Sequence, residues 1–594
     1  MNTNIAITGE SIISAIGLDK SAVLQSLREQ RTGIGKMAYL HSTHKELPVG
    51  EVKLTNDEIK RSLGIDRDRT VSRTALLGIK AVKQALVDAK LECRHADSHA
   101  LRIVLVSGTT VGGMDITENY FRLSDDWEMP ADYLKYHDCG SSTQQIVDYF
   151  GIFNEFTTIS TACSSAANAI ILGANLIKNG QADIVVAGGT EALSRFHLNG
   201  FNSLMILDKE LCKPFDADRA GLNLGEGAAY VVLETEEIAK LRGVVPHAYL
   251  RGYGNACDAF HQTASSENGE GAYLAMTEAL SMAHLEPNEI QYINAHGTGT
   301  VNNDASESAA LLRVFGKDLP YVSSTKGFTG HTTSASGCIE AVICLLSMRN
   351  HFVPANLGWH HQMVNGITPT LGVKDCELHN ILCNSFGFGG NDSSLIISST
   401  PVDTDCPANE RTCLEKDIRI ASEIEINSEE QLTEIRNYVT PLEARRMGKI
   451  MKSSLLSSLK ALEMTGIKVP DAIITGTALG CWENSELMLK QLIEEGETPV
   501  RPTYFMQSTH NTIGSNIAIH TKCHGYNVTY TQGEHSLEWA IRDAKMLLKS
   551  GKYKSVLVGC HDETTPLYRS LMERIGVKGL NVIHSVAMVL ICGN

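Results

Sequence analysis

Two patterns of apolar and polar residues alternate along roughly the first 400 positions of the chain. Short runs rich in β-branched residues predict strands at Ile103–Ser107, Thr157–Thr161, Asp183–Ala187, Tyr292–Asn294 and Tyr321–Ser323. Longer stretches with helical spacing predict helices at about Arg69–Leu91, Ser164–Lys178 and Cys338–Arg349. Because strands alternate with helices, we expect layers of α/β structure.

The alternation breaks at Pro401–Glu410, which is polar and contains two prolines. This composition is typical of a linker, which we place at 401–416. We expect two halves before the linker, 1–240 and 241–400, and one further unit after it, 417–594. A chain of 594 residues exceeds the size of a single core, in agreement with this division.

The unit after the linker repeats the first half. Asp183–Glu191 aligns with Lys554–Asp562 at a spacing of 371 residues (554 minus 183). Ser107–Gly112 aligns with Thr475–Gly480 at a spacing of 368 residues (475 minus 107). A spacing that drifts in small steps is typical of a duplicated unit with short insertions and deletions. We therefore expect 417–594 to be a degenerate second copy of the first half.

Composition and cysteine usage indicate a soluble globular protein. Hydrophobic residues make up 43% of the chain and charged residues 20%, and no run approaches about 18 apolar residues. No leader segment precedes the apolar run at Ile5. The 15 cysteines are scattered and form no CxxC pair, which indicates reduced thiols and a cytoplasmic location.

The formal net charge of −16 excludes nucleic acid as the expected partner, because phosphates would be repelled. The densest local group of cations is Arg61, Arg67, Arg69 and Arg73. These arginines form either a local basic patch that binds an acidic partner or an ordinary solvated helix face.

The segment Thr161–Ile170 places a cysteine, Cys163, between a predicted strand and a predicted helix. The unpaired N–H groups at a helix N-terminus favour a thiolate, and the small neighbouring residues leave room for a substrate. Cys163 is therefore a candidate nucleophile. The structural alternative is an inert buried cysteine.

Two further segments place histidines where predicted strands end. His296 follows Tyr292–Asn294, and Thr298 and Thr300 lie just beyond it with hydroxyls that could bind a polar ligand. Lys326 and His331 follow the strand at Tyr321–Ser323. Each segment alone is also compatible with a loop histidine, turn threonines and a surface lysine.

The glycine-rich segment Cys383–Asn391 contains Phe386. It lacks the lysine and the helix of a phosphate-binding loop, so a mobile loop that presents a ring and backbone N–H groups fits better. Asp216 and Asp218 resemble the start of a calcium loop, but the final acidic ligand is missing. The histidines lack zinc spacing, and we expect no metal.

Taken together and in this order, these motifs resemble the β-ketoacyl synthases of fatty-acid and polyketide synthesis. The resemblance covers about 1–400 and includes Thr161–Ser165, Lys213–Asp216, His296–Thr300, Asn303 to Glu307, Lys326 with His331, and Asn384–Gly390. It implies the thiolase-like fold, a five-layer αβαβα sandwich of two similar halves, usually dimeric. The unit 417–594 would be an additional α/β half-module of the same fold.

The resemblance implies a role for each matching residue. Cys163 would accept an acyl chain as a thioester, and His296 and His331 would assist loss of CO2 from a malonyl thioester and stabilise the enolate. Lys326 would orient the region of His331, and Glu307 would be a structural anchor.

The remaining implied roles concern the acyl carrier. The backbone N–H groups of Cys163 and Phe386 would form the oxyanion hole, and Phe386 would also be a gate. Thr298 and Thr300 would bind the phosphopantetheine arm of an acyl carrier protein, which brings the substrate, so that the enzyme has no cofactor of its own. The patch Arg61, Arg67, Arg69 and Arg73 would then dock the carrier.

The second copy has lost the nucleophile, because Cys163 corresponds to Glu534. It has no counterpart of residues after about Glu234, including the histidines. It resembles the ketosynthase-like, chain-length-factor-type proteins of aryl polyene and flexirubin pigment synthesis. We expect 417–594 to be non-catalytic and to pack on a ketosynthase surface, as in a homodimer or a ketosynthase-type heterodimer.

Two alternatives remain for the whole protein. One is a non-catalytic chain length factor, against which the intact Cys163, His296, His331 and Lys326 argue. The other is a thiolase-like enzyme that uses coenzyme A thioesters. A thiolase needs a second catalytic cysteine, and Phe386–Gly390 offers none.

Overall fold

The structure is a computed structural model that describes residues 3–91, 101–121, 132–402 and 418–593. The expected linker, 401–416, therefore lies almost entirely outside the described residues. Among the described residues, no helix is both long enough and apolar enough to cross a membrane.

The described part of the first 402 residues contributes ten strands to one long sheet, adds the two-stranded sheet β10-β9, and places helices around and between the two halves of the long sheet. The strands are β1 (Ile5–Ile13), β2 (Ile103–Gly108), β3 (Glu155–Ile159), β4 (Ile184–Glu191), β5 (Gly227–Thr235), β6 (Ala248–Cys257), β7 (Tyr292–Asn294), β8 (Tyr321–Ser323), β9 (Phe352–Val353), β10 (Lys374–Asp375), β11 (Asn380–Gly387) and β12 (Asn391–Ser398). The helices are α1 (Lys20–Arg28), α2 (Asn56–Leu63), α3 (Arg73–Asp88), α4 (Met114–Tyr120), α5 (Cys139–Phe150), α6 (Ser165–Lys178), α7 (Arg195–Ser203), α8 (Glu236–Leu241), α9 (Glu270–Ala283), α10 (Val301–Phe315), α11 (Lys326–Thr329) and α12 (Ser336–Arg349).

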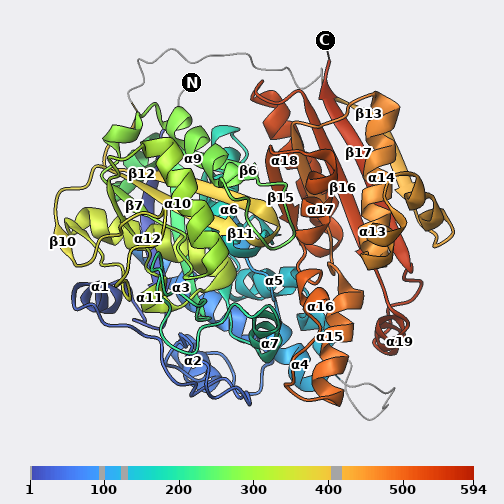
Figure 1. Ribbon diagram of the computed structural model, residues 1–594, viewed down its shortest axis with the longest axis horizontal. Helices are drawn as coiled ribbons and strands as arrows, with labels where there is room; N and C mark the ends of the chain where they lie inside the picture. The colour runs from blue at the N-terminus through green and yellow to red at the C-terminus, as the bar shows by residue number, and fades with distance from the viewer. Residues whose placement is uncertain (1–2, 92–100, 122–131, 403–417, 594) are drawn as a thin grey trace.

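These elements stack in five layers, as the thiolase-like fold requires (Figure 1). The strand order β3-β2-β4-β5-β1 continues through a short β1–β6 pairing into β6-β12-β11-β7-β8. Helices α6 and α12 pack against each other between the two halves of the sheet, while α3 covers one outer face and α9 the other. The middle layer is apolar because almost every residue of α6 and α12 is buried.

The structure contains the predicted strands and helices, but some of them begin or end a few residues from the predicted position. Helix α3 begins at Arg73 rather than Arg69, because the Ser72 hydroxyl accepts a hydrogen bond from the Ala75 amide and caps the helix there. Strand β3 ends at Ile159, since the chain then enters the turn that carries Cys163.

The unit after residue 417 is a second α/β half. Its strands are β13 (Ile418–Ile426), β14 (Ala472–Gly476), β15 (Tyr526–Tyr530), β16 (Ser555–Glu563) and β17 (Ile583–Cys592), and its helices are α13 (Pro441–Arg446), α14 (Lys449–Thr465), α15 (Trp482–Glu494), α16 (Pro502–Met506), α17 (Thr512–Thr521), α18 (Ser536–Lys549) and α19 (Pro566–Arg574). The strand order β15-β14-β16-β17-β13 repeats β3-β2-β4-β5-β1. A break in register occurs near the middle of both β1 and β13. The predicted second copy is confirmed at the level of topology.

The two copies join edge to edge, β15 against β3, so that one sheet runs through the whole molecule (Figure 1). The Ser160 amide donates to the Thr529 carbonyl, and the Thr531 amide donates to the Thr158 carbonyl, each at 2.9 Å. Since 160 pairs with 531 and 158 with 529 in the repeat, each bond is the counterpart of the other. The two copies are therefore related by a local two-fold axis, as in an isologous interface.

Candidate active site

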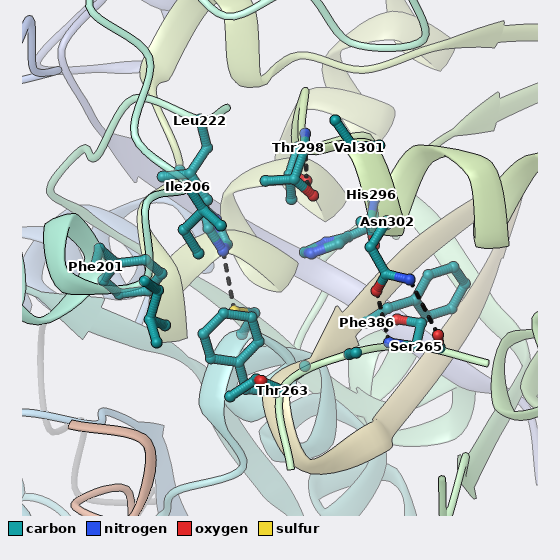
Figure 2. Close-up of a pocket in the computed structure, with 18 of the residues that line it drawn as sticks. Phe201, Ile206, Leu222, Thr263, Ser265, His296, Thr298, Val301, Asn302 and Phe386 are labelled. Carbon is teal, nitrogen blue, oxygen red and sulfur yellow. Dashed lines mark hydrogen bonds between the residues drawn. The ribbon is translucent and has the colours of Figure 1, made fainter. Parts of the chain in front are cut away.

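A cavity of about 350 Å³ lies beside Cys163. Figure 2 shows Phe201, Ile206 and Leu222 along one side of it, facing His296 and Thr298. Its lining also includes Met205 and Val301, whose exposed fractions are 87% and 63%. The cavity thus connects a buried sulfur to the surface.

Cys163 is buried in a single helical turn, Ala162–Ser164, between β3 and α6. Ala162 has a φ of +50°, which L-residues seldom adopt, and the Ser165 hydroxyl stabilises the turn. This hydroxyl accepts a hydrogen bond from the Thr161 amide at 2.9 Å and donates to the Ala162 carbonyl at 2.7 Å. The turn fixes Cys163 at the helix N-terminus that the sequence predicts.

His331 lies directly against the nucleophile, with its Nε2 3.0 Å from the Cys163 Sγ. The loop that carries it is fixed by its backbone, because the His331 amide donates to the Asn223 carbonyl and its carbonyl accepts from the Gly225 amide. Nε2 is therefore within reach of the thiol proton.

His296 is held by two groups on opposite sides. Its amide and that of Gly297 donate to the Glu307 carboxylate at 2.8 and 2.7 Å. The Lys326 ammonium lies 3.3 Å from its Nδ1 and donates to its carbonyl oxygen at 2.5 Å. An ammonium only donates hydrogen bonds, so Nδ1 accepts and Nε2 carries the ring hydrogen.

The expectation for Lys326 is thereby corrected. Its ammonium contacts His296 and the Glu340 carboxylate, the latter at 2.5 Å, and none of its hydrogen bonds reaches His331. Lys326 follows β8 and His296 follows β7, so the parallel pairing of these two strands brings the side chains together.

Burial sets the protonation of the site. It raises the pKa of the Cys163 thiol to about 12, although the Lys326 ammonium and the amides of Phe388 and Cys163 act in the opposite direction. Burial and the Lys326 charge hold the pKa values of His296 and His331 well below the usual range. At neutral pH the site therefore pairs a thiol with two neutral imidazoles. The helix N-terminus alone, from which the sequence predicts a thiolate, is outweighed.

A second correction concerns the glycine-rich loop. The backbone amides that act on the Cys163 thiol to lower its pKa are those of Phe388 and of Cys163 itself, whereas the predicted oxyanion hole uses Phe386. Phe386 is buried in β11, with its ring centroid 5.9 Å from that of His296. Directly after Phe388, Gly389 and Gly390 have φ values of +85° and +76°, so the chain turns sharply beside the Phe388 amide.

Thr298 and Thr300 both line the cavity. Their hydroxyls lie 2.9 Å apart, and the Thr298 amide donates to the Asp304 carboxylate at 3.0 Å. Each hydroxyl thus has a neighbour to fix its orientation, and the pair forms a polar strip along the cavity.

The predicted basic patch is reduced to three arginines. Arg73 is buried and pairs with the Glu226 carboxylate at 2.6 and 2.8 Å, so it is not available to a partner. Arg61, Arg67 and Arg69 are exposed, and Arg67 lies 3.1 Å from the Asp57 carboxylate.

In the second copy, the turn Gly533–His535 occupies the position of the Cys163 turn. The Glu534 side chain is 91% exposed. Its exposed neighbour His535 lies 3.9 Å away. This turn therefore has neither the nucleophile nor a buried proton acceptor.

Two residues that contribute to the active site are not among those predicted from the sequence. Glu340 is a buried carboxylate that faces Lys326, and its signal is a lone acid in the otherwise apolar run Cys338–Leu346. Phe388 contributes through its backbone, for which the sequence carries no signal beyond the glycines around it.

Family models match three stretches of the chain. One described as "Beta-ketoacyl synthase, N-terminal domain" matches residues 2–239, and one described as "Beta-ketoacyl synthase, C-terminal domain" matches 247–360. A further model for the N-terminal domain matches 421–594.

Curated proteins and solved structures agree with these matches. The chain is 32% identical to nodulation protein E of Rhizobium meliloti strain 1021 over 409 residues, which is 66% of this chain and 99% of that protein. It is 30% identical to 3-oxoacyl-[acyl-carrier-protein] synthase 2 of Staphylococcus aureus strain N315 over 416 residues, or 66% and 98%. A structure titled "PfaC Keto synthase-Chain length factor" shares the fold over 99% of this chain and 78% of that one, with a TM-score of 0.78 and 16% identity. The chain belongs to the β-ketoacyl synthase family and carries a second ketosynthase-like half-module.

Proposed function

We propose that the protein is a β-ketoacyl-ACP synthase that catalyses decarboxylative condensation of an acyl thioester on Cys163 with malonyl-ACP. The observation that carries the proposal is the 3.0 Å contact between the Cys163 thiol and a neutral His331 imidazole. We place the reaction in fatty-acid or polyketide synthesis, including synthesis of the aryl-polyene type.

In the first half-reaction, the thiol attacks the acyl carrier thioester. His331 Nε2 takes the proton as the C–S bond forms, and the amides of Cys163 and Phe388 donate to the oxyanion. The carrier thiol leaves with a proton, and the acyl chain remains on Cys163 as a thioester.

In the second half-reaction, a malonyl thioester enters the same cavity and loses CO2. The enolate oxygen accepts a hydrogen bond from Nε2–H of His296, which Lys326 holds in the required tautomer. The enolate carbon attacks the Cys163 thioester, the new C–C bond forms as the C–S bond to Cys163 breaks, and the departing thiolate takes up a proton from solvent. The product is a β-ketoacyl chain, two carbons longer, on the carrier.

The carrier arm would lie along the polar strip of Thr298 and Thr300, with Glu307 holding the loop beneath it. The group supplied from outside is the phosphopantetheine of the acyl carrier protein. The carrier would dock on Arg61, Arg67 and Arg69, which are exposed and positively charged.

We assign residues 1–240 and 241–400 to the two catalytic halves and 417–594 to a non-catalytic module of the chain-length-factor type. The two-fold hydrogen bonds between β15 and β3 support a module that occupies the position of a second subunit. A chain organised in this way contains one reactive site.

The test is a condensation assay read by intact-protein mass spectrometry. Purified protein is incubated with acyl carrier thioesters and malonyl carrier, alongside Cys163→Ala. We expect an acyl adduct on the wild type alone, followed by release of a β-ketoacyl carrier that is two carbons longer. No adduct with any carrier thioester would overturn the proposal, and adducts with coenzyme A thioesters only would indicate a thiolase-like enzyme.

A further inference from the structure

The N-terminal end of helix α17 in the half-module packs against the glycine turn Phe388–Gly390 of the catalytic part. The contact is close, because a Cβ on Gly389 would lie 2.8 Å from the side-chain nitrogen of Asn511. On its other side the same loop meets the turn that carries the nucleophile, since a Cβ on Gly387 would lie 3.3 Å from the Cys163 amide nitrogen. The loop therefore lies between the half-module and the nucleophile.

Asn511 binds both ends of this glycine turn through its side-chain amide. Its Nδ2 donates to the Phe388 carbonyl and to the Asn391 Oδ1, each at 2.7 Å. The Asn391 Nδ2 in turn donates to the Asn527 carbonyl at 3.0 Å, so the Asn391 Oδ1 is an acceptor. Both partners of Asn511 are thus acceptor oxygens, and only the donating side of its amide can face them.

Asn511 does not make the hydrogen bond that its position in the helix favours. It directly precedes α17, where an asparagine oxygen ordinarily accepts a hydrogen bond from an amide of the first turn. Here the side chain caps no amide of the helix, and its buried Oδ1 has no hydrogen-bond partner among the described residues. An unpaired buried oxygen costs free energy. The side chain thus gives up the helix cap and keeps its two bonds to the glycine turn.

A second chain of side-chain amides leads from the half-module to the other oxyanion donor. The Asn527 backbone amide donates to the Asn255 Oδ1 at 2.8 Å, and the Asn255 Nδ2 donates to the Asn168 Oδ1 at 2.8 Å. The Asn168 Nδ2 donates to the hydroxyl oxygens of Thr161 and Ser164, at 2.9 and 3.3 Å. These two hydroxyls flank the nucleophile, so hydrogen bonds connect the half-module to both loops that supply the oxyanion hole.

The catalytic part also holds the glycine turn from its own side. The Gly389 amide donates to the Gln262 carbonyl, and the Gly390 carbonyl accepts from the Asp258 amide, each at 2.8 Å. These bonds restrain the two glycines, whereas the Phe388 carbonyl is held by Asn511. If the bonds to the glycines were sufficient, loss of the Asn511 amide would weaken the junction and leave the chemistry at each site unchanged.

We propose that Asn511 of the half-module is a positioning residue for the oxyanion hole. This rests on the proposed function and gives the half-module a part in it. By holding the Phe388 carbonyl, the Asn511 amide fixes the loop in the orientation in which the Phe388 N–H donates to the oxyanion on Cys163. A donor that is already oriented stabilises the tetrahedral intermediate, and a donor that must first be reoriented contributes less.

The test compares two reactions of the same sulfur, acylation by an acyl carrier thioester and alkylation by iodoacetamide. Acylation passes through an oxyanion and alkylation does not, so only acylation requires the hole. In Asn511→Ala we expect the acylation rate to fall about 10- to 100-fold, less than the 10² to 10³ of a donor removed outright. We expect alkylation of Cys163, measured by peptide mass spectrometry, to change less than about threefold.

Asn516→Ala, in the same helix, is the matched control, because the Asn516 Nδ2 has no hydrogen-bond partner among the described residues. Both rates should stay at wild-type values in this variant. Asn511→Ser is a milder change that retains a shorter donor, and its acylation rate should lie between those of Asn511→Ala and the wild type. Hydrogen exchange read by mass spectrometry should become faster at Phe386–Asn391 in Asn511→Ala and stay unchanged in β15, since the half-module remains docked.

The two rates together decide the role of Asn511. Acylation at the wild-type rate in Asn511→Ala and Asn511→Ser would overturn the inference. Equal losses of acylation and alkylation would also overturn it, because Asn511 would then only keep the two parts of the molecule together. Absence of an acyl adduct on the wild type would instead overturn the proposed function, so the two failures are distinguishable.

Discussion

The turn that carries Cys163 and its counterpart in the second copy have the same backbone geometry. They differ in the identity, burial and neighbours of the central side chain. Ala162 and Gly533 have φ values of +50° and +54°, and the hydroxyls of Ser165 and Ser536 close the turns at the same distances, 2.9 and 2.7 Å. In one turn the central residue is a buried cysteine beside His331. In the other it is an exposed glutamate. The strand-turn-helix unit is therefore a scaffold, and reactivity depends on what is packed against it.

The surfaces of the two copies show the same contrast. Ala167 and Ala174 of α6 are buried, and α12 packs on this helix at Gly337. Their counterparts in α18 are Glu538 and Lys545, which are exposed. The second copy has charged residues where the first is covered by the histidine-bearing half.

The outer strands differ in the same way. All nine residues of β1 are buried, and its outer edge pairs with β6. In β13, Arg419, Glu423 and Glu425 are exposed. Charged residues on an edge strand prevent further pairing, so the half-module is adapted to stand without a second half.

The largest expected difference is in condensation activity when the central residue of one turn or of the other is replaced. Cys163→Ala removes the acyl acceptor and should reduce condensation by a factor of about 10³ or more, while Glu534→Ala should change it less than twofold. Steady-state rates with one carrier thioester pair measure both. A large loss in Glu534→Ala would mean that the second copy takes part in the chemistry.

A somewhat smaller effect tests the missing histidines. His296→Ala removes the donor to the enolate and should lower the condensation rate by about 10² to 10³, with acylation of Cys163 affected less. His535→Ala, in the second copy, is the matched control and should have no effect. Equal losses of acylation and condensation in His296→Ala would contradict a role limited to the enolate.

The pH dependence of thiol alkylation sharpens the contrast further. The pKa of Cys163 is raised to about 12, so its thiolate fraction should grow tenfold per pH unit between pH 7 and 10 without a plateau. The exposed thiol installed by Glu534→Cys should level off near the ordinary value of about 8.5. Iodoacetamide rates followed by peptide mass spectrometry report both sites. A plateau for Cys163 below pH 8 would indicate a resting thiolate–imidazolium pair instead.

The smallest of these effects concerns the junction of the copies. Thr531→Pro removes the amide that donates to the Thr158 carbonyl, and should destabilise the protein by about 1–3 kcal/mol. Thr531→Ala retains that amide and serves as the control. Thermal unfolding measures the difference, and equal stability of the two variants would show that the β15–β3 pairing contributes little.

Much of this organisation is readable from the sequence, because strand patterns are local signals and the repeat is visible as similar segments at a nearly constant spacing. The nucleophile and both histidines are also local, each at the end of a strand. The partner of Lys326 is not, since it depends on the pairing of β7 with β8. The oxyanion donors likewise depend on how the loop through Gly389 folds back, and the burial of Arg73 depends on Glu226, far along the chain.

The most direct test of the account asks whether the turn alone can react. The double variant Cys163→Ala, Glu534→Cys removes the thiol from the first turn and places one on the second, and iodoacetamide labelling read by peptide mass spectrometry verifies that position 534 is accessible. Incubation with an acyl carrier thioester, followed by intact mass, should show no acyl adduct at position 534, whereas wild type carries one adduct on Cys163. Acylation at position 534 at a rate near that of the wild type would contradict the claim that reactivity comes from the histidine-bearing half.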